Sequence, residues 1–170
     1  LAYFQNYTNT FLPVEQFAAY IREAAEMPEL AGISISTRPD CVHPSYLDVL
    51  RQVQTEKGLG ISIELGLQTI HEKTAQYIRR GYRLSCFDQA VENLRKRNIE
   101  VIVHTILGLP GESREEILET MRYLNKKDIQ GIKLQLLHVL SGTDLAADYQ
   151  AGKSSVLDRE EYIDLVIRCL

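Results

Sequence analysis

Residues 101–113, VIVHTILGLPGES, change character halfway along their length. The first seven residues are apolar or β-branched apart from His104, which is typical of a buried strand. Two glycines and a proline then bend the chain, and Ser113 begins a Ser-x-x-Glu spacing that is typical of a helix start. The stretch therefore predicts a buried strand, a pliable turn and a following helix.

The same order of strand, turn and helix recurs along the chain. Apolar runs rich in Ile, Val and Leu lie at 1–5, 30–37, 59–67, 100–109 and 129–140, and helical patterns lie at 14–27, 44–58, 87–98, 113–128 and 158–170. Most of these runs lack polar alternation, so we expect strands of a parallel α/β sheet that are buried on both faces. A doubly wound sheet and a barrel both satisfy this order. Five strands fall short of the eight in a complete barrel, so the pattern favours an arc of a barrel.

The composition is that of one globular domain, which we place over residues 1–170. The chain is 45% hydrophobic and 25% charged. No run approaches the roughly 18 apolar residues of a membrane span, and no basic leader argues for export, so we expect no membrane partner and a cytoplasmic location. Cys41, Cys86 and Cys169 lie far apart in the sequence and predict neither a disulfide framework nor a metal-binding cluster.

The net charge and the two ends of the sequence indicate which partners to expect. The net charge of −4 argues against a nucleic-acid partner, because phosphate binding needs concentrated Lys and Arg. We interpret the basic run Arg79, Arg80 and Arg83 as a solvated helix surface. The chain opens in a strand-like stretch, LAYFQNYTNTF, and closes in mid-helix, so we interpret it as truncated at the N-terminus and the C-terminus. Such an open barrel edge predicts self-association.

Polar residues gather where the strands end. In parallel α/β folds ligands bind beyond the carboxyl ends of the strands, and here these ends are QNYTNT, STRPD, ELGLQT, HTILGLPGE and LLHVLSGT. Helix capping alone also accounts for polar residues there. Glu64 lies inside an apolar run, where an acid is costly unless it faces a ligand or pairs with Arg38 or Lys133. Gln68 either contacts a ribose or an amino acid, or caps the next helix.

Histidines and glycines near these ends leave several interpretations open. His104 and His138 are either hydrogen-bonded core residues or ligands of a catalytic metal. The second interpretation would make the chain a metal-dependent hydrolase. His71 is expected in the first turn of a surface helix. Gly108 would let a ligand approach the backbone closely, and Gly111 permits a positive φ.

Two long stretches, ISIELGLQTIHEKTAQYIRRGY (61–82) and AVENLRKRNIEVIVHTILGLPGESREEILETMRYL (90–124), resemble the radical S-adenosylmethionine (radical SAM) superfamily. The resemblance extends to residues 3–17 and 131–153, so it covers nearly the whole chain. It is nearest to the bacterial Fe–S oxidoreductase group, which is related to the elongator catalytic subunit and to oxygen-independent coproporphyrinogen oxidase. That family has a partial (β/α)6 barrel, and the five strands here resemble its second to sixth.

The resemblance implies a site for SAM at the strand ends, formed by Gln5, Asn6, Tyr7, Glu64, Gln68, His104, Ile106, Gly108 and Leu136. The first three residues stand where the family has its Gly-Gly-Glu motif, whose backbone meets the methionine amino group. Gln68 and Glu64 resemble the fourth-strand motif beside the ribose or methionine part. Ile106, Gly108 and Leu136 occupy the segments that contact adenine. His104 stands where a relative has a ribose-binding acid.

The cysteine motif of the family, C-x-x-x-C-x-x-C, is absent from this sequence. Because a [4Fe–4S] cluster needs thiolates held close together, we expect its ligands upstream of Leu1 and no metal ligand in this chain. The resemblance thus implies most of the catalytic barrel of an oxidoreductase. The intact enzyme would generate a 5′-deoxyadenosyl radical and abstract hydrogen from an unknown substrate, whereas the fragment alone is expected to be inactive. The alternative is a non-catalytic α/β domain that binds a nucleotide or a partner.

Overall fold

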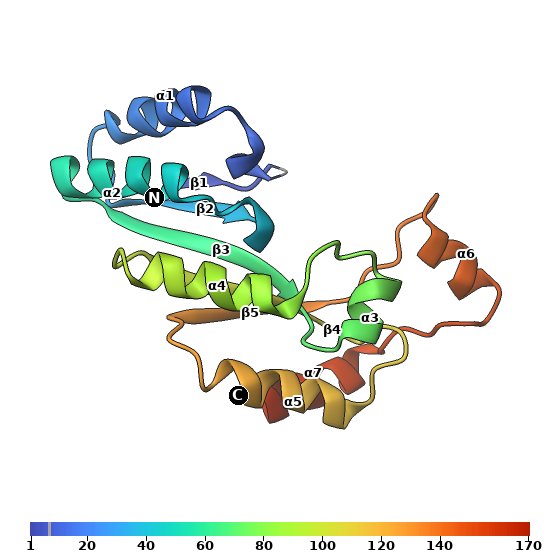
Figure 1. Cartoon of the computed structure of the whole chain (residues 1–170). Coiled ribbons are helices and arrows are strands. Elements are labelled where there is room, and N and C mark those ends of the chain that lie inside the picture. The colour runs from blue at the N-terminus through green and yellow to red at the C-terminus, as the bar shows by residue number, and fades with distance from the viewer. Residues whose placement is uncertain (7) are drawn as a thin grey trace. The chain divides into compact units, whose positions relative to one another are not determined.

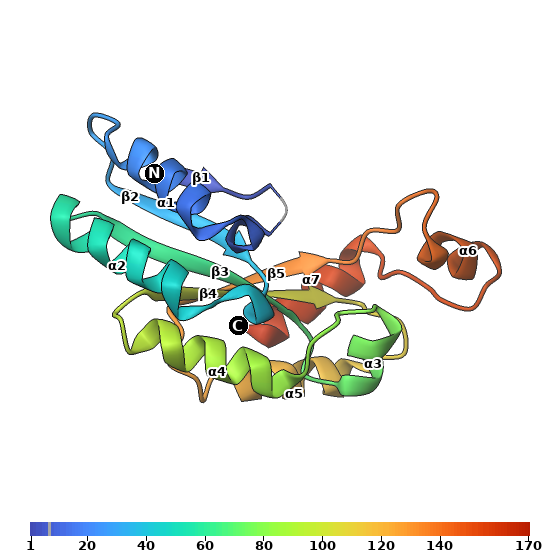
Figure 2. The ribbon, with the colours of Figure 1, turned by 45° about the horizontal axis from the view of Figure 1, so that its top comes forward.

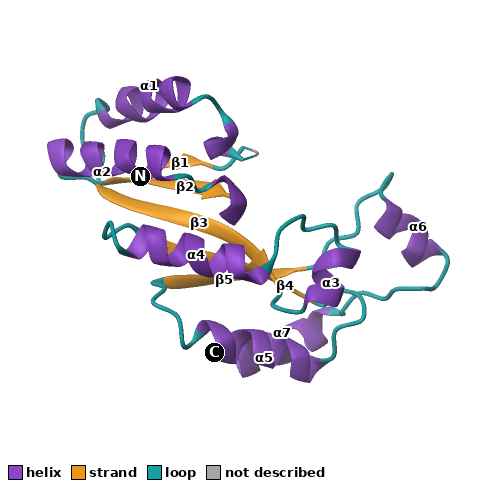
Figure 3. Cartoon of the chain, viewed as in Figure 1, coloured by secondary structure: helices purple, strands orange, loops and turns teal. Residues whose placement is uncertain are grey.

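The computed structural model of the chain describes residues 1–6 and 8–170. It contains five strands, β1 (Ala2–Phe4), β2 (Gly32–Thr37), β3 (Gly60–Gln68), β4 (Glu100–Leu107) and β5 (Gly131–Leu136). The α-helices are α1 (Val14–Ala25), α2 (Pro44–Lys57), α3 (Glu72–Tyr77), α4 (Leu84–Arg95), α5 (Arg114–Leu124), α6 (Asp144–Gln150) and α7 (Arg159–Cys169), and short 3-10 helices lie at Asn9–Phe11 (η1) and Pro39–Cys41 (η2). Figure 3 shows how loops join the strands to the helices.

The strands form a sheet in the order β1-β2-β3-β4-β5, so each strand lies beside the next one in sequence. β1 and β2 are parallel with Ala2 opposite Ile33, and β2 and β3 are parallel with Ile33 opposite Ile61. This order confirms the parallel α/β fold that the alternating pattern predicts. The short helix α6 was not predicted, and α3 was anticipated only by the expected place of His71 in the first turn of a helix. β5 ends at Leu136, whereas the apolar run continues to residue 140.

The faces of the strands differ in burial. In β4, the buried residues Val101 and Val103 alternate with the half-buried residues Ile102 and His104. The expectation of strands buried equally on both faces is therefore wrong for β4, because only alternate residues pack into the core. The less buried face is the one that can carry functional side chains.

The described residues fall into two compact units. The first unit comprises residues 1–67, 82–104 and 128–132. In it α1 and α2 lie side by side, as Figures 1 and 2 show. In their contact, the Phe17 ring of α1 meets the Tyr46 ring of α2 edge-on at a centroid distance of 5.2 Å. Phe17 is 2% exposed, so this aromatic pair closes the core beneath the first two helices.

The second unit comprises residues 68–81, 105–127 and 133–170. In it α7 packs against α5, as Figure 1 shows. Arg114 of α5 pairs with Asp164 of α7 at 2.9 Å. The capping box predicted for Ser113 and Glu116 is confirmed, since each side chain bonds the other residue's backbone N–H. Among the described residues, none of the helices has the length and apolar character needed to cross a membrane.

Candidate functional site

The first unit contains a buried carboxylate. Glu64 of β3 is 4% exposed, and its Oε2 accepts hydrogen bonds from Tyr3 Oη at 2.7 Å and from Ser36 Oγ at 3.1 Å. Its Oε1 accepts a longer bond from Ser34 Oγ at 3.3 Å. The donors come from β1 and β2, whose parallel register brings Tyr3 opposite Ser34. The neighbouring strands therefore supply hydroxyl groups that offset the cost of burying this acid.

His104 joins the same network from β4. Its Nε2 lies 2.8 Å from Glu64 Oε2, and its side chain is 16% exposed. The sequence suggested Arg38 as a partner for Glu64, but Arg38 forms a two-pronged ion pair with Asp40 at 2.6 and 2.9 Å. The structure thus brings two of the predicted site residues, Glu64 and His104, into direct contact.

Gln68 ends β3 and belongs to the second unit. Its φ of +67° lies in the left-handed region, which is costly for a residue with a side chain. Its Oε1 is buried and has no hydrogen-bond partner in the part of the chain that the structure describes. A strained backbone and an unpartnered buried acceptor at one residue are features that a bound ligand would offset.

Arg80 anchors the segment that follows Gln68. Its side chain is 2% exposed; Nη1 donates to the carbonyl of Thr69 at 2.6 Å and Nη2 pairs with Glu72 at 3.3 Å. The interpretation of Arg80 as part of a solvated surface is therefore wrong, because its guanidinium satisfies a backbone carbonyl inside the unit. The adjacent Arg79 has a 79% exposed side chain that pairs with Asp144. Sequence reasoning missed this difference because a run of basic residues does not reveal which one turns inward.

A side chain of the same unit packs against the glycine-rich turn that follows β4. Gly108 has a φ of +83°, and a Cβ there would lie 3.0 Å from side-chain atoms of Leu157. Leu157 thus already occupies the space beside the Gly108 α-carbon, where the sequence suggested close approach of a ligand. Glu112 follows in the turn, and burial raises the pKa of its carboxyl, while hydrogen bonds from Thr69 and Thr74 act in the opposite direction.

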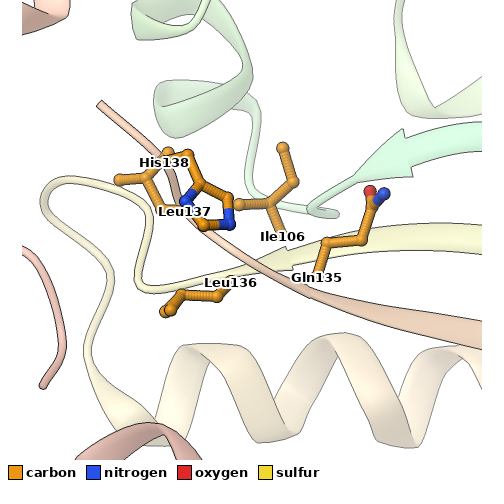
Figure 4. Close-up of a pocket in the computed structure, with 5 residues that line it drawn as sticks. All are labelled: Ile106, Gln135, Leu136, Leu137 and His138. Carbon is orange, nitrogen blue, oxygen red and sulfur yellow. The ribbon is translucent and has the colours of Figure 1, made fainter. Parts of the chain in front are cut away.

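A pocket of about 430 Å³ opens where β4 and β5 end in the second unit. It is lined by Ile106, Gln135, Leu136, Leu137 and His138. Figure 4 shows the Leu136 side chain pointing away from those of Ile106 and Gln135. Leu136 therefore meets the pocket with its backbone, and the apolar side chain of Ile106 forms part of the wall. Such a wall with backbone polar groups suits a flat, partly polar ring.

The remaining predicted residues are placed as follows. Gln5 and Asn6 are exposed after β1, and Tyr7 lies outside the described residues. His71 is the N-cap of α3, just before its first turn, and its Nε2 lies 2.8 Å from the carbonyl of Glu116. Within residues 1–6 and 8–170, no group of three or more His, Cys, Asp or Glu side chains is arranged to hold a metal ion.

Comparison with known proteins gives two family matches. The Radical SAM superfamily model matches residues 4–124, and the model of the Radical SAM C-terminal domain matches residues 129–170. YtqA of Bacillus subtilis is 41% identical over 166 residues, which are 98% of this chain and 51% of that protein. YhcC of Escherichia coli is 37% identical over 162 residues, which are 95% of this chain and 52% of that protein. The chain thus spans about half the length of these curated relatives.

Solved structures show the same fold. The archaeal Elp3 of Methanocaldococcus infernus, with an N-terminal deletion, aligns with a TM-score of 0.82 and 20% identity over 98% of this chain and 43% of that one. The coproporphyrinogen III oxidase HemN of Escherichia coli aligns with a TM-score of 0.69 and 17% identity over 94% of this chain and 36% of that one. These alignments confirm the partial parallel barrel fold. With the superfamily model matched over residues 4–124, the chain belongs to the radical SAM superfamily.

Proposed function

We propose that this chain forms the SAM-binding part of a radical SAM enzyme. The observation that carries the proposal is Gln68, whose buried Oε1 has no partner within the described residues and whose backbone is held at φ +67°. Family membership supplies the identity of the ligand, and the strained glutamine supports a binding role for the end of β3. The activity of the whole protein is part of the proposal, because the chain spans about half of its relatives.

The second unit contains residues whose chemistry suits SAM. In the second unit, Ile106 and the backbone of Leu136 would hold adenine in the pocket. Gln68 can both donate and accept hydrogen bonds, so it suits a ribose or an amino acid. The polar pair of Glu64 and His104 belongs to the first unit, and the family resemblance assigns a role in SAM binding to this pair and to Gln5 and Asn6.

When SAM and a [4Fe–4S] cluster are bound, their chemistry supplies a 5′-deoxyadenosyl radical that abstracts hydrogen from a substrate. This chain's own residues would bind and orient SAM and keep water away from it. We infer that the cluster ligands lie outside these 170 residues, because Cys41, Cys86 and Cys169 do not form a ligand group among the described residues. We also propose that the isolated chain is inactive and that the protein works in the cytoplasm.

The test replaces Gln68 by glycine in the intact protein, with the cluster reconstituted anaerobically. Gln68→Gly relieves the left-handed strain and removes the unpartnered amide, so the variant should be at least as stable as the wild type. The loss of one or two hydrogen bonds should nevertheless weaken SAM binding by about three- to tenfold. Calorimetric titration with SAM measures the affinity, and urea unfolding measures the stability.

Asn98→Gly is the matched control, because Asn98 also has a positive φ, of 55°, but lies in an exposed turn. It should gain similar stability and keep the wild-type affinity for SAM. Equal affinity in the Gln68→Gly and wild-type proteins would refute the binding role of Gln68. Adenosine binding as tightly as SAM would favour the alternative of a non-catalytic nucleotide-binding domain.

A further inference from the structure

A long excursion of the second unit begins and ends beside the pocket of that unit. Residues 139–156, which we call the α6 arm, directly follow His138, which lines the pocket. The arm carries α6 and ends before Leu157, whose side chain lies beside Gly108, two residues after the pocket residue Ile106. Figures 1 and 2 show α6 standing apart from α5 and α7, which pack against each other. The arm is therefore anchored near the pocket at both ends and projects from the unit between them.

The α6 arm exposes apolar side chains instead of packing them. Ala146 is the buried residue of α6, whereas Leu140 is 66% exposed and Tyr149 is 46% exposed. Large apolar side chains are more stable when they leave water, so these two side chains favour a conformation of the arm that covers them. The arm thus carries apolar surface that its position in this structure leaves unused.

A glycine flanks α6 on each side. Gly142 has a φ of +78° and Gly152 a φ of +70°, and a Cβ at either position would meet no described atom within 4 Å. Because glycine adopts positive and negative φ at similar cost, the backbone can turn at both positions without steric hindrance. Hinges of moving elements are a few loop residues of this kind. Residues 139–142 span at most about 14 Å, so a turn at these hinges keeps α6 within reach of the pocket.

Two exposed polar contacts hold α6 against α3. Arg79, two residues after the end of α3, pairs with Asp144, and both side chains are largely exposed. Tyr77, the last residue of α3, donates a hydrogen bond from Oη to Asp148 Oδ2 at 2.8 Å. An exposed pair shifts a conformational equilibrium by about fivefold at most. The arm is therefore held weakly in its position, and a modest competing interaction is enough to move it.

We propose that the α6 arm is a strap that turns at Gly142 and Gly152, leaves its contacts on α3 and closes over the pocket when a ligand fills it. The pocket residues that the structure describes end at His138, so the arm does not line the pocket in its present position. A filled pocket offers the arm a surface to pack on, and this added contact shifts the population towards the closed state. The inference rests on the proposed function for the identity of the ligand, SAM. It adds how access to the pocket is controlled.

The first experiment follows hydrogen–deuterium exchange of the intact protein by mass spectrometry, without ligand. The double variant Arg79→Gln with Tyr77→Phe removes both contacts, so the amides of residues 143–151 should exchange about two- to fivefold faster than in the wild type. Arg122→Gln is the matched control, because Arg122 pairs with Glu115 within α5 and both side chains are more than half exposed. The control should leave exchange in the arm unchanged. Equal exchange in the double variant and the wild type would overturn the proposal.

The second experiment measures SAM binding to the same variants by calorimetric titration. An arm that is freed from α3 closes more readily, so the double variant should bind SAM about two- to fivefold more tightly than the wild type. Arg122→Gln should keep the wild-type affinity. A merely structural role of the two contacts predicts no such gain, because loosening a structural element leaves a binding site unchanged or weakens it. Unchanged or weaker SAM binding by the double variant would therefore overturn the strap.

SAM-dependent exchange in the wild type separates the strap from the proposed function. SAM should slow exchange in residues 133–138, which border the pocket, and in residues 143–151 of the arm. Protection of the first segment without the second means that SAM binds and the arm stays open, which overturns the strap alone. Absence of SAM binding would instead refute the proposed function and, with it, the ligand-driven closure. Circular dichroism checks that each variant is folded.

Discussion

Replacing Arg80 by methionine should destabilise the second unit far more than the same change at Arg79. The Arg80 side chain is 2% exposed and donates to the Thr69 carbonyl at 2.6 Å, whereas Glu72, its acidic partner, is 48% exposed. Methionine has a similar length and fills much of the space, but it leaves the Thr69 carbonyl without this donor. Arg80→Met therefore tests the hydrogen bond rather than the packing.

The magnitude follows from the contacts. A hydrogen bond from a charged group contributes about 1.5–3 kcal/mol, and an abandoned buried acceptor adds to its loss. The half-exposed Glu72 can be solvated by water, so its share is below about 1 kcal/mol. We expect Arg80→Met to lose about 3 kcal/mol of unfolding free energy. Arg79→Met should lose no more than about 0.5 kcal/mol, because Arg79 and Asp144 are 79% and 75% exposed.

Urea unfolding followed by far-ultraviolet circular dichroism measures both variants. The Arg80 effect should persist in 1 M salt, because a buried pair is screened less than an exposed one. In the intact protein, Arg80→Met should also weaken SAM binding, since Thr69 directly follows Gln68. Equal losses of stability in Arg79→Met and Arg80→Met would show that the buried guanidinium does not anchor the segment.

Two further substitutions test the turn after β4. Gly108→Ala should lower the free energy of unfolding by about 1–2 kcal/mol, because φ is +83° and Leu157 lies 3.0 Å from the new Cβ. Adding Leu157→Ala should relieve the crowding but not the backbone cost. An unchanged urea midpoint for Gly108→Ala alone would contradict this reasoning. Burial raises the pKa of the Glu112 carboxyl, so the folded state favours its neutral form. Below the pKa that Glu112 has in the unfolded chain, the carboxyl is neutral in both states and the fold keeps its full stability. As the pH rises through the higher pKa of the folded state, the buried carboxyl must ionise and this stability is lost. Glu112→Gln should therefore raise stability relative to the wild type more at pH 7 than at pH 4, and a gain that is equal at the two pH values would argue against a buried, reluctantly ionised carboxyl.

The strands and long helices were predictable because their signals are local. An apolar run such as 100–109 and a capping box at Ser113 each depend on a few adjacent residues. The helices α3 and α6 contain six and seven residues, which is too few for a 3.6-residue period to become evident. Their existence depends on tertiary packing that no short window records.

The site was predictable in position but not in pairing. Glu64 was conspicuous because an acid in an apolar run must have a partner, but Arg38, one of the two partners that the sequence suggested, pairs with Asp40 instead. The hydroxyl donors Tyr3, Ser34 and Ser36 depend on strand register, and a shift of one residue would turn them to the other face. His104 could be interpreted only after β4 was placed beside β3. Register is a property of the assembled sheet, so these pairings lay beyond the sequence.

The choice of residue at position 68 is the strongest argument that β3 ends in a binding site. A positive φ alone does not distinguish Gln68, because Glu29, Arg79 and Asn98 also retain side chains at positive φ. The exposed Asn98 lies in a turn where its side chain meets water, so its backbone conformation needs no ligand to explain it. Gln68 differs because it combines a backbone cost of about 1–3 kcal/mol with a buried amide oxygen that has no partner among the described residues. Because a buried acceptor without a donor is costly, this combination supports the proposal that a ligand binds at the end of β3.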